Sequence, residues 1–95
     1  MKVVYSQRAR TNRRRQLSYL IEQHAPRAAI KLLKRINYFL NNTLSSHPEI
    51  GTYIPAADLW ECWIPGTKFV VWYSFDQDEL KIIDFWHGSQ DRSAT

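Results

Sequence analysis

The first half of the chain repeats its apolar residues at helical spacing. Leu17, Leu20 and Ile21 fall at positions i, i+3 and i+4, and Ser6 upstream is a good N-cap. A second and stronger stripe follows Pro26, a residue tolerated in the first turn of a helix. Its members are Ala29, Leu32, Leu33, Ile36, Phe39, Leu40, Thr43 and Leu44. The pattern predicts two helices joined by a short break, and polar residues from Asn41 to Pro48 are expected to close the second.

The second half changes to the composition of strands. Residues 59–64, 68–75 and 80–87 are rich in β-branched and aromatic side chains, and Pro65-Gly66 and residues 76–79 supply turns between them. Residues 2–5 form a short β-prone run, and residues 52–54 form another that is cut by Pro55. We therefore predict an α+β domain of order β-α-α-β-β-β over residues 1–95. The helical hairpin is expected to pack on one face of a small antiparallel sheet that the first strand joins.

Composition narrows the class of protein. The chain has 95 residues, enough for one domain, and a hydrophobic fraction of 44% that excludes a disordered chain. No apolar run approaches the roughly 20 residues of a membrane span, and no signal peptide is evident. The single cysteine, Cys62, fits a reducing compartment, so we expect a cytoplasmic protein that does not act at a membrane.

Charge is distributed unevenly. Residues 1–47 hold ten Lys and Arg side chains against one acidic residue, whereas residues 48–95 hold three against eight. Five arginines, Arg8, Arg10, Arg13, Arg14 and Arg15, stand at the start of the first predicted helix, where cations oppose the helix dipole. A solvated helical face remains one interpretation. The alternative is a surface for nucleic acid, ribosome or an acidic protein segment.

Several short motifs follow one another in a recognisable order. They are Tyr5-Ser6 with Ala9, Ala29 in the second helix, residues 47–51 (HPEIG), residues 59–61 (LWE), residues 64–67 (IPGT), residues 69–73 (FVVWY) and residues 87–91 (HGSQD). In this order the chain resembles the RelE/ParE superfamily of bacterial toxins. The turn at residues 64–67 and the ending at residues 87–91 look most like the ParE and plasmid-stabilisation branch.

The resemblance implies the toxin of a type II toxin–antitoxin pair, held inactive by a cognate antitoxin that wraps its helices and sheet. RelE-type members cut messenger RNA on the ribosome, and ParE-type members poison DNA gyrase. A third alternative is a degenerate toxin that only binds its antitoxin. Such antitoxins are commonly acidic and partly disordered, so the basic half of this chain would attract one electrostatically.

A RelE-type ribonuclease needs an acid, a base and cations around the scissile phosphate. His87 and Glu61 are the candidate proton-transfer residues, and Lys68 is the candidate cation, with Arg92 as a further one. Trp60 occupies a position that is usually Arg in the family. The alternative is structural: Glu61 and Lys68 pair across the sheet, and His87 caps its strand.

A ParE-type toxin needs a binding surface and no catalytic residue. The candidate partner-binding residues are Arg10, Arg13, Arg14, Trp60 and Trp63, with Trp86 in the same aromatic set. We expect two of the four tryptophans to be buried. Metal and cofactor binding are not expected, because His24, His47 and His87 lie in separate elements and Cys62 has no partner at ligand spacing.

Overall fold

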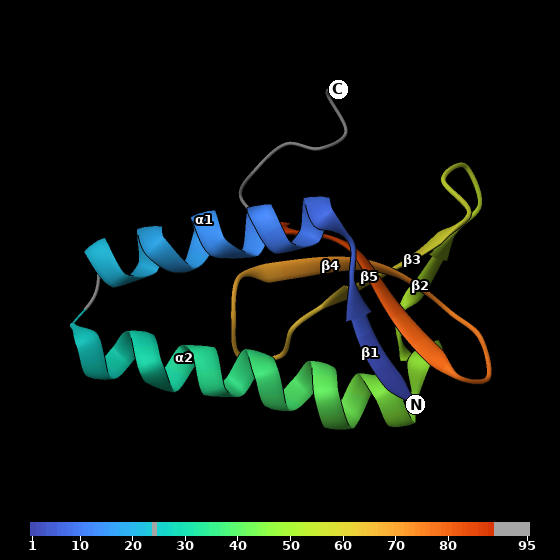
Figure 1. Ribbon diagram of the computed structural model, residues 1–95, viewed down its shortest axis with the longest axis horizontal. Helices are drawn as coiled ribbons and strands as arrows, with labels where there is room; N and C mark the ends of the chain where they lie inside the picture. The colour runs from blue at the N-terminus through green and yellow to red at the C-terminus, as the bar shows by residue number, and fades with distance from the viewer. Residues whose placement is uncertain (24, 89–95) are drawn as a thin grey trace.

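The computed structural model describes residues 1–23 and 25–88 and consists of two helices on a five-stranded sheet (Figure 1). Strand β1 (Lys2–Tyr5) leads into helix α1 (Gln7–Gln23), and helix α2 (Pro26–Tyr38) runs back antiparallel to it. A π-helical segment, η1 (Phe39–Leu44), and a short 3₁₀ turn, η2 (Pro48–Ile50), follow. The remaining strands are β2 (Thr52–Ile54), β3 (Leu59–Trp63), β4 (Phe69–Phe75) and β5 (Glu79–His87).

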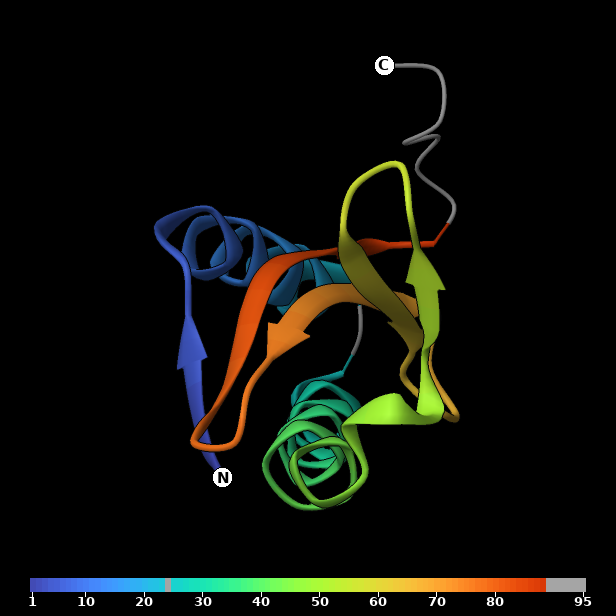
Figure 2. The ribbon, with the colours of Figure 1, turned by 90° about the vertical axis from the view of Figure 1, so that its right-hand side faces the viewer.

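The strand order in the sheet is β1-β5-β4-β3-β2, so β5 lies inside the sheet and β1 and β2 form its two edges (Figure 2). Strands β2 to β5 pair antiparallel, as predicted, while β1 runs parallel to β5 with Lys2 opposite Glu79 and Tyr5 opposite Ile82. The α+β class is confirmed, but the sheet is mixed and gains β2 as a strand. A four-residue strand carries no sequence signal for its pairing direction, and Pro55 lies just beyond β2, where it removes no ladder hydrogen bond.

The helices cover one face of the sheet, as predicted. Ala9 and Leu20 of α1 and Ile36 of α2 join one buried cluster with the side chains of β4 and β5. The other members are Phe39, Leu40, Leu44, Ile64, Phe69, Val71, Tyr73, Leu80, Ile82 and Phe85. Burying one such aliphatic or aromatic side chain stabilises the fold by roughly 1.5–3 kcal/mol.

The start of α1 is fixed to β5 by polar side chains. Ser6 Oγ accepts a hydrogen bond from the Ala9 N–H at 3.0 Å, the expected N-cap, and donates one to the Ile83 carbonyl at 2.7 Å. A register shift in β5 pairs Trp72 with Asp84 and Tyr73 with Ile82, which leaves Ile83 as the extra residue. Asp84, only 2% exposed, accepts a 2.6 Å hydrogen bond from Asn12 of α1. The start of α1 is thus held against β5 by both Ser6 and Asn12.

The second helical stretch ends where the sequence predicts, between Leu44 and Pro48. Helical turns continue past α2 through η1 to Ser46, so Asn41 and Asn42 lie inside them. Leu40 and Leu44 are both fully buried there, and the packing they gain outweighs the weak helix propensity of two asparagines. Ser45 Oγ donates to the Asn41 carbonyl at 2.7 Å, and Tyr73 Oη donates to the Pro48 carbonyl at 2.5 Å. Burial raises the pKa of Tyr73 to about 12.

Candidate partner-binding surfaces

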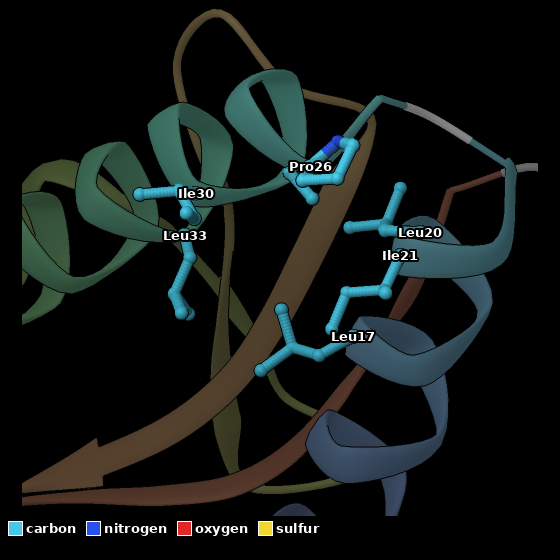
Figure 3. Close-up of a pocket in the computed structure, with 7 residues that line it drawn as sticks. Leu17, Leu20, Ile21, Pro26, Ile30 and Leu33 are labelled. Atoms are coloured by element: carbon cyan, nitrogen blue, oxygen red, sulfur yellow. The ribbon is translucent and has the colours of Figure 1, made fainter.

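The two helices leave an open groove between them near the connection that joins them. Figure 3 shows Leu17, Leu20 and Ile21 projecting from α1 toward side chains of α2. This hairpin groove has a volume of about 210 Å³, and its lining residues are Leu17, Leu20, Ile21, Pro26, Ala29, Ile30 and Leu33. Ile21 is 61% exposed and Ile30 is 54% exposed. Large aliphatic side chains that are exposed to solvent beside an apolar hollow are typical of a surface that another macromolecule binds.

A basic hollow, the arginine cleft, adjoins the groove at Leu17. Tyr5, Arg10, Arg13, Arg14 and Leu17 line about 410 Å³ of space beside β1. The Arg13 guanidinium stacks over the Tyr5 ring at 5.3 Å and donates a hydrogen bond to Asn37 of α2. Its Nε is buried without a hydrogen-bond partner in the described part of the chain. Burial raises the pKa of Tyr5, and the charge of Arg13 lowers it in part.

The arginines of α1 are largely uncompensated. Within residues 1–23 and 25–88, Arg8 is the one arginine in an ion pair, with its Nε 3.2 Å from Asp84 Oδ2. The first turn of α1 contains no acidic residue. The arginine cleft therefore brings together three of the predicted partner-binding residues, Arg10, Arg13 and Arg14. Among the described residues, no carboxylate lines this cleft.

The tryptophans do not form the single flat set expected from the sequence. Trp60 and Trp63 are three residues apart on β3, so they lie on opposite faces of the sheet. Trp60 contacts Phe75 at a centroid distance of 5.4 Å beside the core, whereas Trp63 is 55% exposed. Trp86 is 4% exposed and meets Trp72 edge-on at 5.2 Å. Contrary to the expectation of two buried tryptophans, only Trp86 is buried, while Trp60 and Trp72 are half-buried.

One family of known proteins matches nearly the whole chain. Residues 3–92 match the family described as the ParE toxin of the type II toxin–antitoxin system parDE. The chain belongs to this ParE toxin family. A search of curated proteins finds no match. The match confirms the resemblance seen in the sequence motifs and makes this protein a toxin of the type II class, for which the family implies a cognate antitoxin.

The candidate catalytic residues of this ParE-family toxin are divided between the two faces of the sheet. His87 lies edge-on to Phe69 on the core side, and Lys68 and His87 line one cleft. Glu61 lies opposite Trp72 and accepts a 2.8 Å hydrogen bond from its indole Nε1. Phe69 and Trp72 are three residues apart on β4, so Glu61 is on the other face. The structure brings Lys68 and His87 together and places Glu61 elsewhere, paired with Trp72 rather than with Lys68.

Other expected site residues fall outside the described part of the chain, namely His24, Arg92 and residues 89–91. Within residues 1–23 and 25–88, no three His, Cys, Asp or Glu side chains gather in a way that could hold a metal ion. None of the helices described is both long and apolar enough to cross a membrane.

Sequence analysis missed two features of the ParE-family toxin. Tyr5 was placed in a strand and in the Tyr5-Ser6 motif, but no contact with an arginine was predicted for it. In the structure its ring supports Arg13. The signal in the sequence was a β-prone aromatic residue beside an Arg-rich helix start. The exposure of Ile21 had no signal, because periodicity gives each helix an apolar stripe but not the distance between the two helices. Ile30 lies outside the stripe predicted for the second helix, and that position was the signal for its exposure.

Proposed function

We propose that this protein is a ParE-type toxin that inhibits DNA gyrase in the cytoplasm and is neutralised by an acidic antitoxin segment. The proposal of an antitoxin-binding surface is supported by one observation: Leu17 lines both the hairpin groove and the arginine cleft, so the two are continuous. An amphipathic segment would bury apolar side chains between the helices and place carboxylates beside Arg10, Arg13 and Arg14. Charge attraction would speed the encounter, and the apolar contacts would supply most of the affinity.

We favour gyrase over messenger RNA as the target, because the candidate residues for RNA cleavage are few and do not all gather at one site. Glu61 is engaged by Trp72 and lies on the face opposite His87, so the two cannot act as acid and base on one phosphate. Trp60 stands at a position that is usually Arg in the family, so it offers no cation to a phosphate, and its ring packs beside Tyr53 and Phe75. Inhibition of gyrase needs no catalytic group, and exposed Trp63 is the aromatic anchor we assign to that contact.

Two assays on the purified toxin separate the targets. In a supercoiling reaction with gyrase and relaxed plasmid, the toxin should block supercoiling, and pre-incubation with the antitoxin encoded beside it should restore it. In a translation extract the same toxin should leave messenger RNA intact. Message cleavage without any effect on gyrase would contradict the gyrase assignment. Failure of both assays, with antitoxin binding retained, would indicate a degenerate toxin.

A ribonuclease is the second candidate, because Lys68 and His87 do share a cleft. Under that alternative Lys68→Ala and His87→Ala should each abolish cleavage at the ribosome. Cleavage that survives both substitutions would show that these residues are not the catalytic ones, even if the activity itself is real.

A further inference from the structure

A second basic surface adjoins the hairpin groove at Leu20. Lys31 and Arg35 of α2 line a hollow of about 240 Å³ together with Leu32 and Gly66. A neighbouring hollow of about 480 Å³ shares Leu32 and Gly66 and adds Lys68 and His87, with Tyr19 and Gln23 at the end of α1. We call these two hollows the turn cleft. The three cations converge on it from two elements far apart in the sequence.

Two of the cations of the turn cleft share one helix face, and one of them lies against Gly66. Lys31 and Arg35 are i and i+4 neighbours on α2, so their side chains leave the same helix face about 5–6 Å apart at Cβ. Gly66 has a φ of +75°, and a Cβ built there would collide with the Arg35 guanidinium. Glycine thus permits both the turn and the close seat of Arg35 against it. The Lys68 carbonyl accepts a 2.6 Å hydrogen bond from the Gly88 N–H.

The surroundings of this cleft differ from those of the arginine cleft. The lining of the turn cleft is more polar than that of the hairpin groove, and its large exposed apolar side chain is the ring of Tyr19, at 56%. A folded peptide segment would find charge and one exposed ring here, but no large exposed aliphatic side chains like Ile21 and Ile30 of the hairpin groove. A phosphate backbone needs only cations and hydrogen-bond donors. Lys31, Arg35 and Lys68 have no carboxylate partner within the described residues.

From these observations we infer that the turn cleft contacts the phosphate backbone of duplex DNA. The inference rests on the proposed gyrase target, because gyrase holds duplex DNA and a toxin bound to it can touch both. The turn cleft meets the hairpin groove at Leu20, which lines both. The antitoxin segment and the DNA would therefore occupy adjoining surfaces of the toxin.

The test measures binding of a fluorescent 24-base-pair duplex to the full toxin without gyrase, over a series of salt concentrations. Three phosphate contacts predict a slope of log K against log salt of about −2.7. Lys31→Glu with Arg35→Glu should weaken binding more than 10-fold and reduce the slope to about −0.9. The matched control is Lys2→Glu with Lys81→Glu, which has the same change in net charge at two exposed lysines near the other end of β5. The Kd of this control variant for the duplex should stay within about twofold of the Kd of the unmodified toxin when both are measured at the same salt concentration.

Three outcomes would overturn the inference. Equal losses in the two double variants would mean that binding follows net charge alone. Tighter binding of a single-stranded RNA of equal length would reject duplex DNA as the partner. Polyglutamate that displaces the labelled duplex at a lower concentration of negative charges than unlabelled DNA requires would assign the cleft to an acidic protein. If the toxin binds duplex DNA through this cleft but leaves gyrase unaffected, the proposed function is refuted while the assignment of the cleft to DNA still holds.

Discussion

Replacing Ile21 and Ile30 together by serine tests whether the hairpin groove is the antitoxin-binding surface. The two side chains are 61% and 54% exposed, so a bound segment can remove more than half of each from water. Full burial of an isoleucine side chain is worth roughly 1.5–3 kcal/mol, so covering the exposed part contributes about 1–2 kcal/mol for each residue. The double variant should therefore lose about 2–4 kcal/mol of binding free energy, and its antitoxin Kd should rise about 30- to 700-fold.

Calorimetric titration with the antitoxin gives the Kd, and thermal unfolding gives the stability of the free toxin. Because both side chains are already exposed, the free energy of unfolding should change by only about 0.5–1 kcal/mol. Ile50→Ser is the matched control, since Ile50 is 51% exposed on η2, outside the groove. An unchanged Kd for the double variant would refute the assignment, as would an equal loss of affinity in the Ile50 control.

Three further predictions concern stability and the target. Ser6→Ala removes the cap of α1 and its bond to β5, and should lower the free energy of unfolding by about 1–2 kcal/mol in urea titrations; no loss would contradict the capping role. Tyr73 has a folded-state pKa of about 12, above the unfolded value near 10, so its stabilising effect is complete below pH 10 and is lost as the pH rises through 12. Tyr73→Phe should flatten the fall in stability between those values, which denaturation at pH 9, 10.5 and 11.5 would detect, and an unaltered fall would place the cause elsewhere. Trp63→Ala should raise the toxin concentration needed to inhibit gyrase by about 30-fold with the fold intact, and unchanged inhibition would remove Trp63 from the contact.

Much of the fold follows from residue patterns that depend on local physics. Ser6 caps α1, Pro26 begins α2, and His87 ends β5, each as expected from the sequence. Capping, the fixed φ of proline and the preference of β-branched residues for strands act over a few residues. The two stripes of apolar residues also sufficed to predict that the helices cover one face of the sheet.

What the sequence did not reveal depends on contacts between distant elements. The parallel pairing of β1 is decided by where α1 must begin along β5, and Ser6 and Asp84 make that junction only in the folded chain. The register shift at Ile83 turns Asp84 toward α1, and no local pattern announces it. Pairing of Glu61 with Trp72 likewise follows from strand register.

The candidate sites show the same division. The sequence shows that α1 begins with a cluster of arginines. Only the structure shows that Arg8 pairs with Asp84 while Arg13 stacks on Tyr5. Trp60 and Trp63 were grouped by type, although their odd spacing on β3 sends them to opposite faces. The alternation of side chains along a predicted strand is enough to place them on opposite faces.

The most direct test of the central claim is the topology of a reporter plasmid extracted within minutes of inducing this toxin in cells. Inhibition of gyrase predicts a shift toward relaxed topoisomers that precedes any loss of messenger RNA, and co-expression of the antitoxin should abolish the shift. Plasmids that keep their supercoiling while growth stops and messages disappear would contradict the gyrase assignment.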